Sequence, residues 1–272
     1  KEEKPYLLIG FGGYVSTSVA ILSRILKVNV YIHEANSLPG TANRINNLIS
    51  TKTFETFPAT FKKSPKIIHT GNPTNDLFKS IQGPEFKYTE DKKTYNLLVF
   101  GGSQGAKFLN DNIPFALSHF PENIMIKHIS GEDNTDSVAR LYKKFKLNAD
   151  VISFSNEMYQ LYDWADIIIS RAGSMTITEL SLAGRASILI PYPYATDNHQ
   201  LKNAEYLADH NSTIIIQENV SFCEQLVNNL NYLFIKQIKM YQMAINIKSL
   251  FPANSTDIIL QEILTNNEKY DN

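Results

Sequence analysis

The sequence predicts an α/β protein built on parallel sheets, and two patterns carry this prediction. Short runs of Ile, Val and Leu alternate along the chain with longer segments whose apolar residues recur at helical spacing. Strands that are apolar on both faces are typical of parallel sheets covered by helices on each side. Glycine-rich loops also follow several of these runs directly, and an open parallel sheet places its ligand at such loops.

The expected elements alternate along the whole chain. We expect strands over residues 6–10, 28–32, 66–69, 95–100, 124–129, 150–153, 166–169, 186–190 and 213–216. We expect helices over residues 16–26, 105–118, 135–145, 156–163, 174–183, 199–209 and 221–248. A last helix is expected over residues 255–270, where apolar residues recur at helical spacing and Ser255 can cap the first turn.

A domain boundary is expected at the sequence TGNPTNDLF, because glycine, proline, asparagine and charge concentrate there and over residues 79–94. Residues 76–254 hold enough strand–helix units for one complete doubly wound domain. Residues 1–75 hold only three expected strands, fewer than the ~4–6 of a usual sheet, so we expect this first domain to be incomplete. We expect residues 255–272 to form a helix that packs back on the first domain.

The composition is that of a globular protein with no marked affinity for nucleic acid. The 272 residues are 43% hydrophobic and 19% charged, and a net charge of −1 gives no electrostatic reason to expect a nucleic-acid partner. The single cysteine, Cys223, excludes an internal disulfide framework and fits a reducing compartment. No apolar run approaches the ~18 residues that a transmembrane helix needs.

Two glycine loops are typical of phosphate or sugar binding. In LLIGFGGYVS, Gly10, Gly12 and Gly13 stand between an expected strand and an expected helix. In NLLVFGGSQGAKF, the glycines of residues 101–105 let the backbone approach a diphosphate, and the helix start that follows favours an anion. Ser103 adds a hydroxyl donor to this second loop. The alternative for the second loop is a tight turn that is packed for its own sake.

Side chains that suit a nucleotide sugar follow two further strands. Glu179 falls in the first two turns of a helix that Ser174 can cap and Gly184 can end, and its carboxylate can accept hydrogen bonds from the two hydroxyls of a ribose. The alternative for Glu179 is a surface helix residue. Residues 197–200 bring carboxylate, amide and imidazole groups to the end of strand 186–190, which suits a sugar with several hydroxyls.

A third polar group ends the expected strand 28–32. His33, Glu34 and Asn36 stand there, again at the carboxyl end of a strand. The alternatives are a turn cap for Asn36 and a buried, satisfied histidine for His33. The loops of the second domain agree with one another in position, and this agreement favours a ligand site more strongly than any single loop does.

Six blocks in order resemble the MurG family of bacterial transferases: GFGGYVS, HEANSLPGTANR, TGNPTND, GGSQGAKFLN, SRAGSMTITEL and PYPYATDNHQLKNA. The resemblance spans about residues 5–265. It implies the GT-B fold, with two Rossmann-like domains of which the N-terminal one is incomplete. It also implies inverting transfer of N-acetylglucosamine from UDP-N-acetylglucosamine to lipid I, which forms lipid II in peptidoglycan synthesis and so serves cell shape and division.

The resemblance further implies partners and a location. UDP-N-acetylglucosamine is implied as a substrate rather than a cofactor, and neither a metal nor a cofactor is implied. The implied partners are lipid I, the cytoplasmic membrane surface and other cell-wall synthesis proteins. The implied location is peripheral, on the cytoplasmic face of the inner membrane.

The resemblance assigns roles to residues at matching positions. It implies that Glu179 contacts the ribose, that Gln200 beside Asp197 reads the sugar hydroxyls, that Asn36 reaches the donor sugar, and that the backbone of Ser155 reads uracil. The residues implied to hold the diphosphate and nucleotide are Gly102, Ser103, Gln104, Gly105, Gly173, Ser174, Met175 and Thr176. The residues implied to line the acceptor-domain cleft are Gly12, Gly13 and Tyr14.

Three departures from the family pattern bear on the chemistry. Asn75 stands where the family usually has an arginine, and asparagine has no charge to pair with a diphosphate. Ala35 replaces a glutamine. The family's earlier GTGGH-like loop, with a histidine thought to serve the chemistry, has no counterpart here, which leaves His33 and Glu34 as candidates to remove the acceptor proton.

Two other functions stay open at this point. The chain can be a UDP-sugar-binding half that needs a separate acceptor-domain partner. Less favoured is a GT-B epimerase acting on UDP-N-acetylglucosamine.

Overall fold

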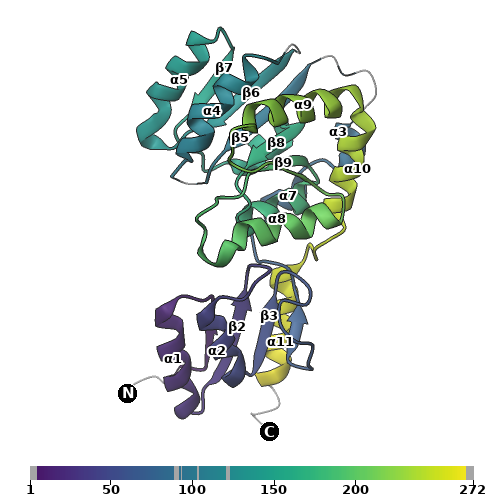
Figure 1. Cartoon of the computed structure of the whole chain (residues 1–272). Coiled ribbons are helices and arrows are strands. Elements are labelled where there is room, and N and C mark those ends of the chain that lie inside the picture. The colour runs from purple at the N-terminus through teal and green to yellow at the C-terminus, as the bar shows by residue number, and fades with distance from the viewer. Residues whose placement is uncertain (1–4, 89–91, 93, 103, 121–122, 268–272) are drawn as a thin grey trace. The chain divides into compact units, whose positions relative to one another are not determined.

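The computed structural model describes residues 5–88, 92, 94–102, 104–120 and 123–267, and its chain divides into two compact units (Figure 1). Unit 1 consists of Lys1–Thr74 and Phe251–Asn272, and unit 2 of Asn75–Leu250. The division differs from the expected domains at two places: Asn75 belongs to unit 2, and residues 251–254 belong to unit 1.

Unit 1 contains one parallel sheet in the order β1-β2-β3-β4. Its strands are β1 (Leu7–Gly10), β2 (Asn29–Glu34), β3 (Lys52–Glu55) and β4 (Ile67–His69), and its α-helices are α1 (Tyr14–Ile25), α2 (Thr41–Ile49) and α11 (Ser255–Asn267). The expectation of three strands was wrong, because β3 reads KTFE and lacks an apolar run. The expected helices also lacked α2, whose sequence TANRINNLI is rich in asparagine.

Alternate side chains of β2 point to opposite faces of the sheet, as a strand requires. Val30 and Ile32 pack with Ala20 of α1 and with Ile49 of α2. On the other face, Tyr31 packs with Phe54, Ile259 and Ile263, the last two from α11. The sheet of unit 1 is therefore covered by α1 and α2 on one face and by the C-terminal helix on the other (Figure 1).

Unit 2 contains a six-stranded parallel sheet in the order β10-β9-β8-β5-β6-β7. Its strands are β5 (Tyr95–Phe100), β6 (Ile124–Ile129), β7 (Ala149–Ile152), β8 (Ile167–Ser170), β9 (Ala186–Leu189) and β10 (Ile214–Ile215). From β5 the chain first winds outward through β6 and β7 and then returns to build β8, β9 and β10 on the other side. The winding direction thus reverses between β5 and β8, and open α/β sheets bind ligands at such a switch point.

The α-helices of unit 2 differ from expectation in three places. They are α3 (Pro84–Lys87), α4 (Lys107–Leu117), α5 (Thr135–Lys144), α6 (Met158–Trp164), α7 (Ser174–Ala183), α8 (His199–Asp209), α9 (Phe222–Ile235) and α10 (Gln237–Lys248). The expected helix 221–248 is two helices, because Lys236 adopts φ −111° and ψ 65°. The short α3 was not expected, and Gly173 rather than Ser174 occupies the cap of α7.

Two helix boundaries follow from single residues. Gly184 ends α7 in the left-handed conformation at φ 60°, as the sequence predicted. Ser255 is the first residue of α11, and its hydroxyl donates to the Pro252 carbonyl at 3.1 Å. Among the described residues, no helix combines the length and the apolar character that crossing a bilayer requires.

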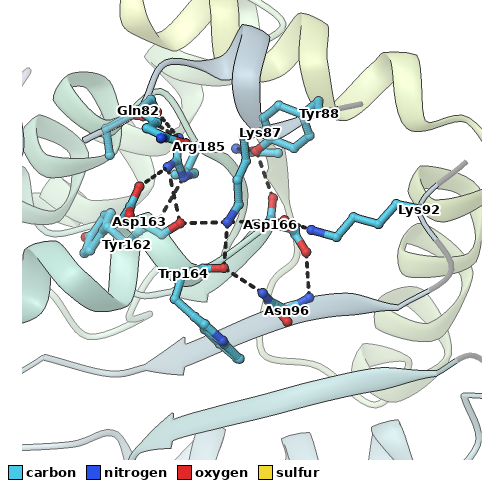
Figure 2. Close-up of polar contacts among 12 residues, drawn as sticks. Gln82, Lys87, Tyr88, Lys92, Asn96, Tyr162, Asp163, Trp164, Asp166 and Arg185 are labelled. Atoms are coloured by element: carbon cyan, nitrogen blue, oxygen red, sulfur yellow. Dashed lines mark hydrogen bonds and ion pairs between the residues drawn. The ribbon is translucent and has the colours of Figure 1, made fainter. Parts of the chain in front are cut away.

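A cluster of buried charges anchors α3 beside the amino ends of β5 and β8 (Figure 2). Arg185 is fully buried and donates to the carbonyls of Gln82 at 3.0 Å and Tyr162 at 2.8 Å, and it pairs with Asp163 at 3.1 Å. Asp166 pairs with Lys92 at 2.5 Å and with Lys87 at 3.5 Å. The cluster fastens Gln82, Lys87 and Lys92 to the sheet, at the end opposite to the glycine loop.

Candidate functional site

A cavity of about 380 Å³ lies at the carboxyl ends of the strands of unit 2. It is lined by the last residues of β5 and β6 and by the segments that follow β5, β7 and β8, which brings residues distant in sequence together at the switch point. The lining residues are Phe100, Gly102, Ile129, Phe154, Ser155, Met158, Met175, Thr176 and Glu179. Five of the residues predicted from the sequence line this cavity: Gly102, Ser155, Met175, Thr176 and Glu179.

The glycine loop after β5 is shaped by close backbone contacts. Gly105 has φ +74°, and a Cβ atom at this residue would lie 2.0 Å from the carbonyl oxygen of Ser130. Gly131 has φ +85°, and a Cβ there would lie 2.5 Å from the carbonyl oxygen of Gln104. The loop therefore packs flat against the turn after β6, and only glycine fits on either side. Ser103, the predicted hydroxyl donor, lies outside the described residues.

The helix α4 that follows this loop begins without a side-chain cap. Its N-cap is Ala106, and its first turn contains no acidic residue. The first N–H groups of a helix have no partner within the helix and carry partial positive charge. The loop and the start of α4 together offer backbone donors to an anion.

Glu179 projects from α7 into this cavity and is half-buried. The hydroxyl of Tyr162 donates to its carboxylate at 2.9 Å. Burial raises the pKa of Glu179 to about 7, against a smaller lowering by the Tyr162 hydrogen bond. Burial also raises the pKa of Tyr162 well above its ordinary value, so this residue remains a hydroxyl donor at neutral pH. The sequence reasoning missed Tyr162, which looks like an ordinary apolar position of α6.

The loops after β8 and β9 are held together by Gln200 and Arg171. The side-chain oxygen of Gln200 accepts from the backbone N–H of Tyr192 at 2.9 Å and of Ala172 at 3.3 Å. Because this oxygen is occupied, a hydrogen bond from Gln200 to a ligand must use its NH₂ group as donor. Arg171 is buried, pairs with Glu218 and donates to the Ile190 carbonyl at 3.0 Å. The ion pair between Arg171 and Glu218 was not predicted from the sequence.

Two further predicted residues of unit 2, Asp197 and Asn75, belong to tight turns. Asp197 is exposed, and its positive φ of 50° places it in a tight turn just before α8. The side-chain oxygen of Asn75 accepts from the Leu77 N–H at 3.0 Å and so caps the 3₁₀ turn Asp76–Ser80. Asn75 therefore serves its own turn and supplies no charge for a diphosphate.

In unit 1, Glu34 organises the loop that follows β2. Its side chain is 4% exposed, and its two oxygens accept from the N–H of Asn36 at 3.0 Å, the N–H of Gly40 at 3.1 Å and the amide of Asn43 at 2.9 Å. The side chain of Asn36 also donates to Glu34 at 3.4 Å. A carboxylate with this many donors stabilises a loop, and its geometry does not favour the predicted role of base.

His33 is equally buried, at 1% exposure. Its Nε2 lies 3.0 Å from the Gly71 carbonyl oxygen, which makes Nε2–H the donor. Burial is the main cause that lowers the pKa of His33, so the ring is neutral at pH 7. Gly12 and Gly13 adopt φ +93° and +82° in the loop after β1, and Tyr14 begins α1 with its side chain 96% exposed. Gly13 and Tyr14 are exposed, and Gly12 is half-buried like Asn36.

Comparison with known proteins decides the family. The description "Glycosyltransferase family 28 C-terminal domain" matches residues 96–257, and "Glycosyltransferase family 28 N-terminal domain" matches residues 1–55. The chain is 35% identical over 263 residues to a Pseudomonas entomophila protein named UDP-N-acetylglucosamine--N-acetylmuramyl-(pentapeptide) pyrophosphoryl-undecaprenol N-acetylglucosamine transferase, and covers 72% of that protein. The match includes 96% of this chain. The chain belongs to the MurG family.

Two further comparisons agree with this family. A Coxiella burnetii protein of the same name is 37% identical over 220 residues, which are 80% of this chain and 62% of that protein. The crystal structure of Acinetobacter baumannii MurG matches with a TM-score of 0.82 at 31% identity, over 93% of this chain and 72% of that one. This chain thus spans between about three-fifths and three-quarters of the length of these MurG relatives. The predicted α/β GT-B fold and MurG membership are confirmed.

Proposed function

We propose that the chain is an inverting glycosyltransferase that transfers N-acetylglucosamine from UDP-N-acetylglucosamine to lipid I and forms lipid II. The observation that carries this proposal is the cavity of unit 2, where Glu179 and the glycine loop meet at the switch point of a MurG-family sheet. The names of the curated relatives supply the donor and the acceptor.

The cavity has groups that suit each part of the donor. Phe100, Ile129 and Phe154 give apolar surface for a base, and the backbone near Ser155 can read its edge. The carboxylate of Glu179 accepts from the ribose hydroxyls, and the NH₂ of Gln200 donates to a sugar oxygen. The backbone donors at the start of α4, with those of Gly102 and Gln104 in the glycine loop, stabilise the diphosphate.

In the proposed reaction, the C4 hydroxyl of the lipid-linked muramyl sugar attacks the anomeric carbon of the donor. The bond from that carbon to the diphosphate oxygen breaks, and UDP leaves with the electron pair. Negative charge grows on the diphosphate as this bond breaks, so the donors of the glycine loop and α4 act most strongly in the transition state. A base removes the proton of the attacking hydroxyl.

The acceptor also implies where the protein works. Lipid I is anchored in the bilayer by its polyprenyl chain, so a transferase that uses it must reach the membrane surface. We therefore infer peripheral binding at the cytoplasmic face of the membrane, where UDP-sugars are available.

A second candidate function is a UDP-sugar-binding half that acts with a separate acceptor-domain partner. Burial of both His33 and Glu34 favours it, because neither side chain is open to an acceptor hydroxyl and the base must then come from elsewhere. Transfer to a soluble lipid I analogue, measured with and without an added N-terminal fragment of a MurG relative, separates the two functions. Activity of the chain alone supports the first, and activity only with the fragment supports the second.

Calorimetric titration of UDP-N-acetylglucosamine tests the donor site directly. The wild-type chain should bind, and Glu179→Ala should weaken binding by roughly 1.5–3 kcal/mol, because the charge-assisted hydrogen bonds to the ribose are lost. Glu224→Ala, at an exposed residue of α9, is the matched control and should bind like wild type. Absence of heat at millimolar ligand contradicts the donor site, and unchanged affinity of Glu179→Ala contradicts the role of that residue.

Donor affinity should increase as the pH rises from 6 to 8. The pKa of Glu179 is about 7, so the carboxyl is mostly protonated at pH 6 and mostly ionised at pH 8. Only the ionised form accepts from both ribose hydroxyls, so the Kd for UDP-N-acetylglucosamine should fall several-fold, by at most about tenfold, over this interval. An acid–base titration of free UDP in the same buffers gives the contribution of the ligand's phosphate ionisation, which is subtracted. Glu179→Gln should abolish the remaining dependence of the Kd on pH. A dependence that Glu179→Gln retains assigns the effect to another group.

A further inference from the structure

A second cavity of unit 2, of about 600 Å³, lies at the amino end of β10. Its walls come from the end of α8, the start of β10, the end of α9 and the helix α10. The donor cavity lies instead at the carboxyl ends of the strands. Gln200, which holds the loops on that side, stands at the other end of α8, about 12 Å along the helix axis from Ala208 of the second cavity. The two cavities are therefore separate.

Two bends of the chain shape the second cavity. Lys236 joins α9 to α10 at φ −111° and ψ 65°, so α10 leaves the direction of α9 (Figure 1). Asn211 turns the chain after α8 at φ 54°, and its carbonyl accepts from Nδ2 of Asn246 on α10 at 3.2 Å. This hydrogen bond ties the turn after α8 to α10 and holds two walls of the cavity together.

The polar side chains that line this cavity are cationic or neutral. Tyr232, Lys239 and Gln242 are exposed there, and among the described residues no hydrogen bond or ion pair engages their hydroxyl, ammonium and amide groups. None of the described lining residues is acidic. The ammonium of Lys236 lies 5.8 Å from the centre of the Tyr232 ring, which adds a second positive charge beside the cavity.

The surrounding stretch of chain has the same sign of charge. Residues 225–256 contain Lys236, Lys239 and Lys248 but no aspartate or glutamate, whereas the whole chain has a net charge of −1. An anion that enters the cavity therefore meets ammonium groups without competing carboxylates from the second half of α9 or from α10. Electrostatic attraction of this kind favours a negatively charged ligand.

Apolar side chains complete the lining. Leu233 and Met243 are buried, and Ile214 is half-buried. A cavity of several hundred Å³ that combines apolar surface with a few polar groups is typical of small-molecule sites. The amides of Gln242 and Asn246 can both donate and accept, which suits the hydroxyls of a ligand. The remaining charge requirement is a single anionic group.

We propose that the second cavity binds a small organic phosphate, with its phosphate on Lys239 and its hydroxyl-bearing body on Gln242 and Asn246. A lysine ammonium binds phosphate as a point charge. The apolar edge of the ligand packs on Met243. A free sugar phosphate and the headgroup of an anionic phospholipid both carry this chemistry, and the two sources can be distinguished by experiment. The site goes beyond the proposed transfer reaction, which uses the donor cavity.

Methyl NMR of the 272-residue chain, labelled with ¹³C-methyl methionine, tests the proposal. Met243 lines the second cavity, whereas Met175 lines the donor cavity, so one sample reports on both. Glucose 1-phosphate, the probe, should shift the Met243 signal saturably, and glucose should not. Lys239→Gln should raise the Kd of the probe about fivefold or more, because a charge-assisted hydrogen bond is lost. Lys143→Gln, at an exposed lysine of α5, is the matched control and should bind like wild type.

Vesicles identify the source of the phosphate. Binding to phosphatidylglycerol vesicles, but not to phosphatidylcholine vesicles, that Lys239→Gln weakens supports the site with a lipid headgroup as its ligand. The proposal is overturned if neither glucose 1-phosphate nor phosphatidylglycerol binds, if glucose shifts the Met243 signal as glucose 1-phosphate does, or if Lys239→Gln binds both probes like wild type. Titration of UDP-N-acetylglucosamine into the same sample tests the donor site separately, because an unshifted Met175 signal contradicts that site alone.

Discussion

Replacing Asp166 with alanine should lower the free energy of unfolding by about 3–5 kcal/mol. The Asp166 side chain is 1% exposed, and both of its oxygens are used. One oxygen contacts the ammonium groups of Lys92 at 2.5 Å and Lys87 at 3.5 Å, and the other accepts from the Asn96 N–H at 2.8 Å (Figure 2). Removing the carboxylate leaves two cations without this counter-charge and a backbone donor without its acceptor.

The environment of Lys87 explains why the expected loss is large. Its ammonium also donates to the carbonyls of Asp163 at 2.7 Å and Trp164 at 2.8 Å, so it is held in place after the substitution. Burial already lowers the pKa of Lys87, and the attraction of Asp166 is the main cause that opposes this lowering. Without Asp166, the protein must keep a poorly solvated charge or release its proton.

Urea unfolding measures this effect, with Asp209→Ala as the matched control. Asp209 is an exposed acid at the end of α8, and its substitution should change the free energy of unfolding by no more than about 0.5 kcal/mol. A loss below about 1 kcal/mol for Asp166→Ala would show that the lysines find solvent and that the cluster is no anchor.

The strands and helices that could be predicted from the sequence alone are those whose buried side chains are mostly apolar. Every strand of unit 2 was expected within one or two residues, because each contains apolar residues, mostly Ile, Val and Leu. In unit 1, β3 escaped notice because three of its four residues, Lys52, Thr53 and Glu55, are polar. Glu55 of β3 is buried because its two oxygens accept from the N–H groups of Ala59 and Phe61 at 3.0 Å each. Periodicity does not reveal such satisfied polar groups.

The site residues also divide into those that a local pattern predicts and those that only contacts in the folded chain reveal. Glu179 was predicted because it stands early in a helix that follows a strand and a glycine-containing loop, where its carboxylate can reach a ligand at the end of the sheet. The partner that tunes it, Tyr162, lies 17 residues earlier in the chain, on another helix, and gives no local signal. Glu34 ends a strand, where a ligand is also expected, yet the amides of Asn36 and Asn43 and the N–H of Gly40 close around it. Position after a strand therefore predicts a site, but only packing decides which carboxylates remain open.

Replacing Gly105 with alanine should weaken binding of UDP-N-acetylglucosamine at least tenfold and lower the free energy of unfolding by about 2–5 kcal/mol. Gly105 has φ +74°, which strains any residue with a Cβ atom. The added Cβ would also lie 2.0 Å from the Ser130 carbonyl oxygen, a backbone atom that cannot swing aside. The loop must then lift from the turn after β6, and its N–H groups leave the positions proposed to hold the diphosphate.

Alanine substitutions at two other glycines test whether the loss comes from the close contact of the Gly105 loop or from replacing glycine in general. Gly40→Ala places a Cβ in open space at an ordinary φ of −64°, so it should leave donor binding unchanged and, as the N-cap of α2, cost no more than about 1 kcal/mol of stability. Gly131→Ala strains the other side of the same contact, since its Cβ would lie 2.5 Å from the Gln104 carbonyl oxygen. It should therefore reproduce the loss of donor binding although Gly131 is not itself proposed to bind ligand. If Gly105→Ala and Gly131→Ala both bind the donor like wild type, the position of this loop does not determine diphosphate binding.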